Sequence, residues 1–369
     1  MEMQEAYMGT SGGMLNWGNS AVKGVKLYGD VRFRYQWESS KRATSERQQL
    51  RYRVRLGADY QFTDNFRAGV RASTAASETS TNVTLAGFGG GGIGNNDQLK
   101  MDLWYLIYEN DDMFGSGLVD NVQFGLGKFK QPFMIDKAFW DGDINPEGFY
   151  QSVGWDDLFV DGLDVQFTAG QFVTNGAELE GAATTQNGSM DFLFAQEVKF
   201  KYSNFTVAPS FWISTEHAQN QASFDNGGTN FNSFAAIMIP ASYKFKAFGY
   251  SHGLKATYGV NVAESEANQL FQFGYKLGSA KKKGTWEIGA DFRYIENQAW
   301  DANITDSDFH DRTANGNGAY GYKLGAKYAV TDNIIVGGSY YHSFDINNQS
   351  SAATVAEEQL AQFDINWKF

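Results

Sequence analysis

The 369-residue chain lacks several features that mark common protein classes. It has no cysteine, which excludes disulfides and thiol catalysis. It has only four prolines and no linker-like segment, which favours one large unit over several domains. No apolar run approaches the roughly 18 residues of a membrane-spanning helix, so a helical membrane protein is excluded. A membrane β-barrel is not excluded, because its strands alternate apolar and polar residues and look hydrophilic on average.

Basic residues and histidines are also few. The net charge is −12, which argues against nucleic-acid binding as the main function. The four histidines are scattered without the spacing of metal ligands, so we predict neither a metal site nor a cofactor. The first residues, MEMQEAYMGTSGG, lack the basic start and apolar run of a secretory signal, so either the chain stays inside the cell or the signal has been removed by processing.

What the chain does contain is regular alternation. The segment LRYRVRLGADYQF (residues 50–62) has apolar or aromatic residues at almost every second position, with Arg51, Arg53 and Arg55 between them. A period of two indicates a β-strand with one apolar and one charged face. Similar segments recur along the chain, and helical periodicity is almost absent. The only helix candidates lie within residues 1–22 and 131–148.

Counting these segments predicts about sixteen strands, joined alternately by short turns and long polar loops. TDN at 63–65 and again at 331–333 is typical of the short turns, because Asn and Asp tolerate left-handed backbone angles. The long loops are rich in Gly, Ser, Asn and Thr. The expected strands lie near 24–38, 47–62, 66–75, 98–109, 118–130, 149–155, 163–173, 190–202, 205–216, 233–245, 252–263, 269–277, 285–297, 319–330, 334–346 and 358–369.

The predicted fold class is all-β, a transmembrane antiparallel β-barrel with short periplasmic turns and long extracellular loops. The strand lengths, the even strand number and the alternation of turns and loops are typical of outer-membrane barrels. Closure of the sheet also removes edges whose backbone groups lipid cannot satisfy. The alternative is a soluble all-β protein, but its loop lengths would vary without this alternation. Aromatic residues near strand ends, as in Tyr35 and Trp37, also suit membrane interfaces.

The C-terminal segment AQFDINWKF gives a separate signal for a membrane barrel. It is an alternating strand that ends on an aromatic residue, as the last strand of outer-membrane proteins commonly does, and their assembly machinery reads that end. The residues expected on its membrane-facing side are Phe363, Ile365, Trp367 and Phe369. An ordinary amphipathic edge strand that ends on Phe by chance is the alternative.

Several segments resemble the bacterial "putative porin" family of outer-membrane proteins. They are YGDVRFRYQWE (28–38), RQQLRYRVRLGADYQFTDNFRAGVRASTAASETSTN (47–82), MDLWYLIYE (101–109), FGLGKFKQPF (124–133) and DGDINPEG (141–148). The resemblance is dense over roughly the first 155 residues and then rests on strand rhythm and the terminal Phe. It implies a sixteen-stranded passive diffusion channel that assembles as a homotrimer and whose third loop (131–148) folds into the pore. Residues 1–22 are then a periplasmic segment and 23–369 the barrel.

Seven arginines on three neighbouring strands are predicted to face the lumen, because a basic residue facing lipid would cost roughly 2–4 kcal/mol at the bilayer midplane. Some of them could also pair with Asp30 and Asp59 to hold the wall together. The predicted basic patch consists of Arg32, Arg34, Arg51, Arg53, Arg55, Arg67 and Arg71.

The third loop, QPFMIDKAFWDGDINPEGFYQ, supplies opposite charge. Folded inward, its carboxylates would confront the arginine patch and set up a field across a narrow constriction. An acidic, solvated extracellular loop is the alternative. The acids predicted at the constriction are Asp136, Asp141, Asp143 and Glu147.

Two other motifs are weak. GFGGGGIG (87–94) has a GxGxxG spacing, but no strand–helix context, so it is interpreted as a flexible loop and not a nucleotide site. The acidic segment DANITDSDFHD (301–311) could bind calcium, but its spacing is not that of an EF-hand, and a solvated loop is the preferred interpretation.

The predicted function is a water-filled porin in the bacterial outer membrane for passive diffusion of ions and small hydrophilic solutes. Its expected partners are outer-membrane lipid, lipopolysaccharide, those solutes and further copies of itself. A substrate-selective channel that binds anions is an alternative. An outer-membrane enzyme or adhesin built on a closed barrel ranks lower, since no Ser-His-Asp arrangement is evident and no enzymatic activity is predicted.

Overall fold

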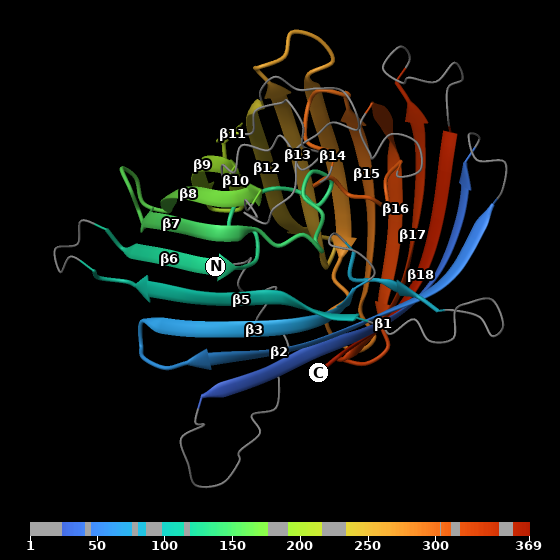
Figure 1. Cartoon of the computed structure of the whole chain (residues 1–369), viewed down its shortest axis with the longest axis horizontal. Coiled ribbons are helices and arrows are strands. Elements are labelled where there is room, and N and C mark those ends of the chain that lie inside the picture. Colours follow the sequence, from blue (N-terminus) through green and yellow to red (C-terminus); the bar gives the residue numbers. More distant parts are fainter. Residues whose placement is uncertain are drawn as a thin grey trace, which may run out of the picture.

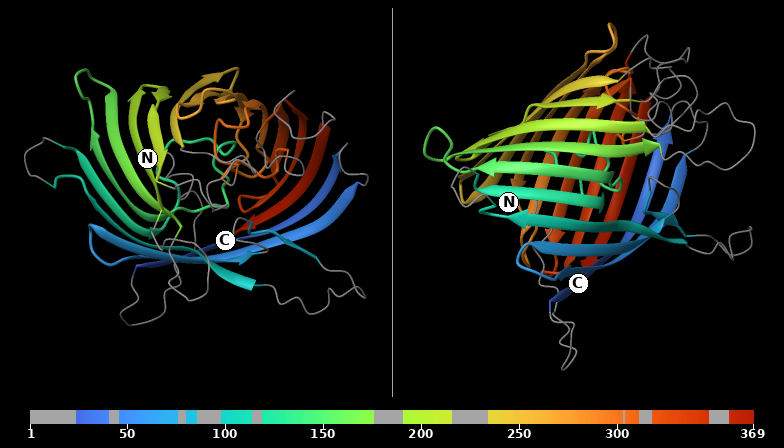
Figure 2. Two further views of the ribbon diagram at one scale, coloured as in Figure 1. Left: turned by 45° about the horizontal axis from the view of Figure 1, so that its top comes forward. Right: turned by 60° about the vertical axis from the view of Figure 1, so that its left-hand side comes forward.

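The chain forms a closed antiparallel β-barrel, here in a computed structural model (Figures 1 and 2). The structure describes residues 24–40, 46–75, 80–85, 98–113, 119–175, 191–215, 234–302, 304–310, 318–346 and 357–369. The predicted periplasmic segment 1–22 and the glycine-rich segment 87–94 lie outside these ranges. No helix long and apolar enough to cross a membrane occurs among the described residues.

The barrel wall consists of sixteen strand crossings, as predicted. Of the eighteen strands, β4 is a two-residue strand within a loop, and β10 and β11 together make one crossing between β9 and β12. The bounds are β1 (Val25–Ser40), β2 (Arg47–Gln61), β3 (Phe66–Ala75), β4 (Val83–Thr84), β5 (Gln98–Asn110), β6 (Asn121–Lys128), β7 (Glu147–Trp155), β8 (Leu163–Asn175), β9 (Asp191–Tyr202), β10 (Phe205–Val207), β11 (Ser210–Ser214), β12 (Ala235–Ala247), β13 (Tyr250–Asn261), β14 (Gln269–Gly278), β15 (Trp286–Ile295), β16 (Ala319–Ala329), β17 (Ile334–Asp345) and β18 (Glu357–Lys368).

Two predictions of local secondary structure differ from the structure. The single strand predicted at 205–216 is interrupted at Ala208–Pro209, because proline has no backbone N–H to donate to the ladder. The helix considered within 131–148 is wrong, since that segment consists of turns, irregular backbone and the start of β7. The least regular predicted strand, 149–155, is confirmed as the greater part of β7.

The first and last strands close the barrel. β1 pairs antiparallel with β18 in a register that runs from Asp30 opposite Lys368 to Ser40 opposite Glu358. The chain end takes part, because the backbone groups of Gly29 and Phe369 exchange two hydrogen bonds of 3.0 and 3.1 Å. Gly29 is required there: an added Cβ would lie 2.6 Å from both the Phe369 ring and a backbone oxygen of β2.

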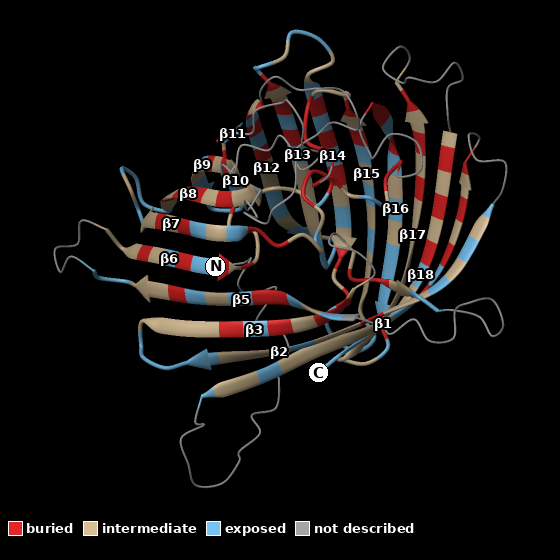
Figure 3. Cartoon of the chain, in the orientation of Figure 1, coloured by how far each residue is buried: buried red, intermediate tan, exposed pale blue. Residues whose placement is uncertain are grey.

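The two faces of each strand have the predicted polarity. On β2, Leu50 and Leu56 are 57% and 53% exposed on the outside of the barrel, whereas Arg53, directed inward, is 8% exposed. Figure 3 shows this alternation along many strands. The C-terminal strand follows it too, with outward residues Phe363, Ile365, Trp367 and Phe369 all classed as exposed. A continuous apolar outer face of this kind suits contact with lipid.

Aromatic side chains form interfacial belts at both rims. At the rim of short turns, Tyr60, Phe62, Phe66, Tyr108 and Phe124 make a chain of ring contacts with centroids 4.8–6.3 Å apart. At the opposite rim, rings on β14 and β15 stack on each other, as do rings on β16 and β17. Such girdles are typical of both interfaces of a membrane barrel.

The difference between the two faces can be tested by moving one arginine. Leu56→Arg places a guanidinium on the outer face near the middle of β2 and should lower the free energy of unfolding by about 2–4 kcal/mol. Ser339→Arg, at a position that lines the interior cavity, should have a much smaller effect. Reversible guanidinium unfolding from lipid vesicles measures both. Equal destabilisation by the two variants would contradict the assignment of the faces.

Candidate functional site

A cavity of about 950 Å³ lies inside the barrel and is the candidate functional site. It is lined by twelve arginine and lysine side chains and nine carboxylates among the described residues, so its wall carries an excess of positive charge although the whole chain is at −12. The basic lining residues are Arg32, Arg34, Arg47, Arg51, Arg53, Arg55, Lys137, Lys244, Lys255, Lys276, Lys323 and Lys327.

Five of the seven predicted arginines form one wall of this cavity. They lie on β1 and β2, where the register places Arg32 opposite Arg53 and Arg34 opposite Arg51. Like charges directly opposite each other are destabilising in a sheet. The repulsion is offset by carboxylates on the same face: Asp30 accepts hydrogen bonds from Arg53 and Arg55 at 2.8 and 2.6 Å.

The last strand, β18, and the connection between β3 and β5 also stabilise this wall. Arg34 reaches across the seam to Asp364 on β18 with N–O distances of 2.7 and 3.0 Å. Arg32 hydrogen-bonds the side-chain oxygen of Asn82, and Arg51 lies 3.4 Å from the backbone oxygen of the same residue. The stretch around Asn82 is held against β2 by the short strand β4, and it lines the cavity beside the arginines.

The two remaining predicted arginines do not line the cavity. Arg71 on β3 is 4% exposed and pairs with Asp102, whose backbone oxygen also accepts a 3.0 Å hydrogen bond from Asn145 of the third loop. Arg67 lies on β3 away from the lining residues. The alternation of β3 correctly directs both side chains inward, but the third loop lies between Arg71 and the open lumen.

The third loop, residues 129–146 between β6 and β7, lies inside the barrel (Figure 2). Its aromatic side chains hold it there: Phe133 and Trp140 contact Trp212 on the barrel wall, with ring centroids 5.0 and 5.9 Å apart. All three rings are nearly inaccessible to solvent. Burial of several aromatic rings supplies the main stabilisation of a segment that has no regular secondary structure.

The four predicted acids of this loop separate into two groups. Asp141 and Asp143 line the cavity. Asp136, also in the loop, is not among the lining residues; Lys255 and Gln272 contact it at 2.8 and 2.9 Å. Glu147 is not in the loop at all; it begins β7 and pairs with Lys128 at 2.6 Å. The loop boundary predicted at 148 is therefore two residues too far along the chain.

Asp143 and Asp136 are both stabilised as anions. Burial alone would raise the pKa of each, but nearby cations outweigh it. Arg53, 3.4 Å from Asp143, and the Thr81 hydroxyl at 2.7 Å lower the pKa of Asp143 below its usual range. Lys255 lowers the pKa of Asp136 to about 2. Both carboxylates are charged at any physiological pH.

Asp141 has the opposite environment. Burial, followed by repulsion from Asp306 and Asp143, raises the pKa of Asp141 to about 7. The Asp143 backbone N–H donates to it at 2.8 Å, which only partly offsets these effects. Its charge therefore changes near neutrality, unlike those of the other two loop acids.

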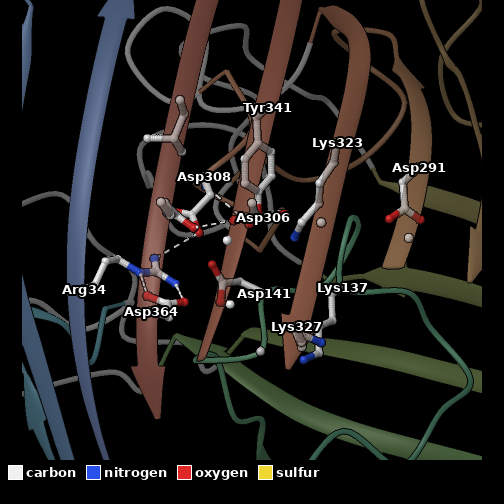
Figure 4. A pocket seen from close by; sticks show the side chains of 18 of the residues that line it. Arg34, Lys137, Asp141, Asp291, Asp306, Asp308, Lys323, Lys327, Tyr341 and Asp364 are labelled. Carbon is white, nitrogen blue, oxygen red and sulfur yellow. Dashed lines mark hydrogen bonds and ion pairs between the residues drawn. The ribbon is translucent and has the colours of Figure 1, made fainter. Parts of the chain in front are cut away.

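The prediction that residues 301–310 form a solvated surface loop is wrong. They lie inside the barrel, and Asp306 and Asp308 line the same cavity as Asp141. Figure 4 shows these three carboxylates between Arg34 on one side and Lys323 on the other. Among the described residues no group of three or more His, Asp or Glu side chains could hold a metal ion, and Asp311 lies outside them. Buried Trp300 just before this stretch is the signal that could have revealed it.

A Ser-His-Asp contact also occurs, although no such arrangement was predicted. His310 lies 2.9 Å from the Ser343 hydroxyl and 2.6 Å from a carboxylate oxygen of Asp345. The three residues are only 1–2% exposed. These contacts join His310 to two residues of β17 and so anchor the loop to the barrel wall.

Comparisons with known proteins agree with this architecture. The model of a family described as "Putative porin" matches residues 37–208 and 229–369. OprB of Pseudomonas putida has a similar structure at 13% identity and a TM-score of 0.58, covering 96% of this chain and 97% of its own. OmpF of Salmonella typhi, in a complex with daunomycin, has 13% identity and a TM-score of 0.56, with 94% and 97% covered. A mutant Rh. blastica porin has 12% identity and a TM-score of 0.51, with 94% and 100% covered. No curated protein sequence matches the chain.

The raised pKa of Asp141 predicts a pH-dependent charge in the cavity. Lowering the pH through about 7 protonates Asp141, because its pKa lies there, and removes one negative charge from the lining. The reversal potential in a salt gradient across a planar bilayer should then shift toward anions. Asp141→Asn should lose this step, and a step that persists unchanged in the variant would assign the titration to another group.

Proposed function

Because this chain belongs to the bacterial "putative porin" family, its barrel is an outer-membrane channel, and we propose that ions and small hydrophilic solutes diffuse through it past a charged constriction. The observation that carries this proposal is the meeting of opposite charges in one cavity. Arginines of β1 and β2 line it, and the third loop brings Asp143 to 3.4 Å from Arg53 and adds Asp141 to the lining. Fixed opposite charges across a narrow, low-dielectric passage orient polar solutes and disfavour nonpolar ones.

The balance of charge in the lining favours weak anion preference. Cationic side chains outnumber carboxylates by twelve to nine among the described lining residues. Several of the cations are paired with carboxylates, such as Arg53 with Asp30 and Lys327 with Glu287, so the net field is smaller than the number of arginines suggests. Passive diffusion with modest selectivity follows from a wall of this kind.

A substrate-selective channel for anions is the second candidate, and the excess of positive charge in the lining is the observation that favours it. The two candidates differ in saturation. A selective channel binds its anion, so conductance levels off at millimolar concentration and other permeant ions are blocked. A diffusion channel shows conductance that rises in proportion to salt.

We further propose that the channel assembles as a homotrimer within outer-membrane lipid, beside lipopolysaccharide, and acts without a chemical step. The apolar outer face and its two aromatic girdles support residence in a membrane. Native mass spectrometry from detergent tests the trimer directly. A purely monomeric species that still conducts would overturn that part of the proposal and leave the channel intact.

The role of the arginine wall is tested by neutralising Arg51, Arg53 and Arg55 to Gln together. Loss of three positive charges should shift the reversal potential toward cations, because Asp30 and Asp143 keep their charge. Lys281→Gln, in an exposed turn, is the matched control and should have no effect. Stepwise conductance of the unaltered protein is the prerequisite. An unchanged reversal potential in the triple variant would remove these arginines from the ion path.

A further inference from the structure

The connection between β15 and β16 turns into the barrel rather than away from it. Trp300 is fully buried there, and its ring contacts Trp212 at 5.6 Å and Phe234 at 5.3 Å between centroids. These rings belong to the same buried cluster as Phe139 and Trp140 of the third loop. Two long loops from opposite parts of the sequence therefore share one apolar core inside the pore.

The two loops are also joined by directional hydrogen bonds. The indole N–H of Trp300 donates to the backbone oxygen of Phe139 at 2.7 Å. The backbone N–H of Asp141 donates to the oxygen of Ile304 at 2.7 Å. The backbone N–H of Asp306 donates to the oxygen of Ala138 at 3.3 Å. The third loop has no strand partner along this stretch, and buried backbone groups require partners, so these bonds satisfy groups that the barrel wall does not reach.

The connection is in turn fixed to the wall at several points. Asp306 pairs with Arg293 on β15 at 2.7 Å, and Arg293 is only 2% exposed. Asp308 lies 3.4 Å from Arg34 on β1. His310 contacts Asp345 on β17 at 2.6 Å. Anchors on three different strands hold the segment in one position, so it can serve as a support for the third loop.

We propose that residues 296–310 form a second constriction loop, which holds the third loop in position through Trp300 and adds Asp306 and Asp308 to the charges that select ions. This inference rests on the channel function proposed above and assigns that function to a second segment. Trp300 is a positioning residue, since it acts through the third loop. Asp308 is a selectivity residue, since its carboxylate lines the cavity that ions cross.

Access to the pore can be tested at a residue that makes none of the wall contacts described above. Ser307 is exposed and lines the cavity, and the chain has no cysteine, so Ser307→Cys introduces a unique thiol. A cationic methanethiosulfonate reagent forms a mixed disulfide with that thiol and releases methanesulfinate. Modification should remove part of the single-channel current, and a reducing agent should restore it. Lys282→Cys, in an exposed turn, should be modified without any change in current.

The outcomes separate the two proposals. If unmodified Ser307→Cys protein does not conduct although it is folded, the channel function fails. If it conducts and complete modification, confirmed by mass spectrometry, leaves the current unchanged, the second constriction loop is wrong. Loss of current on modification supports it.

The positioning role has its own variant. Trp300→Phe keeps an aromatic ring but loses the N–H that binds Phe139, so the third loop should fluctuate and the open-channel current should become noisier and close more often. Trp286→Phe, at a tryptophan that stacks on Tyr250 at the barrel surface, is the control. Heat-modifiable gel mobility verifies folding of both. Equal noise in the two variants would contradict the positioning role.

The charge role is measured separately. Asp308→Asn should shift the reversal potential toward anions, because it removes a negative charge from the lining and leaves Arg34 paired with Asp364. Asp332→Asn, in the exposed turn between β16 and β17, removes a charge of the same sign far from the cavity and should leave the reversal potential unchanged. A shift of equal size in both variants would exclude Asp308 from the ion path.

Discussion

The need to pair every backbone polar group within lipid determines the rest of this molecule. A sheet that crosses a membrane must close on itself, because an open edge would leave N–H and C=O groups without partners. Closure here depends on the pairing of β1 with β18 and extends to the last residue through the bonds between Gly29 and Phe369. Once the sheet is closed, the outer face of every strand must be apolar, and the charged side chains of the membrane-spanning part are directed inward. The pore is electrically charged as a direct consequence.

Concentrating charge in a small interior creates repulsion that the interior itself must offset. Asp30 lies between two arginines of β2. Asp364 pairs with Arg34 across the seam, and Asp143 of the third loop pairs with Arg53. These contacts hold the wall together and also reduce the field that a passing ion meets. Asp141 is the exception, since carboxylates surround it and no cation neutralises it at hydrogen-bond distance among its described contacts.

The barrel could be predicted from the sequence because strand alternation and turn chemistry are local properties. The period of two placed Arg53 inside and Leu56 outside, and TDN marked the turns. The same pattern could not distinguish Arg53 from Arg71, because exposure to the lumen depends on where a distant loop lies. Glu147 was assigned to the loop on composition, but it belongs to β7, where it pairs with β6.

The sequence also could not show whether a long loop turns into the barrel or away from it. Residues 301–310 are polar enough to read as solvated, and their inward path depends on Trp300 packing against Trp212, a contact between segments about ninety residues apart in sequence. The third loop was predicted to fold inward mainly because of the family resemblance, and no comparable resemblance existed for the second constriction loop. Long-range packing of single aromatic residues is the part that local patterns do not encode.

Arg34 joins the seam of the barrel to its interior. Its guanidinium contacts Asp364 on the last strand and Asp308 on the loop before β16. Closure of the sheet and the position of the second constriction loop therefore depend on the same side chain, and a change at Arg34 affects both the wall and the passage that it encloses.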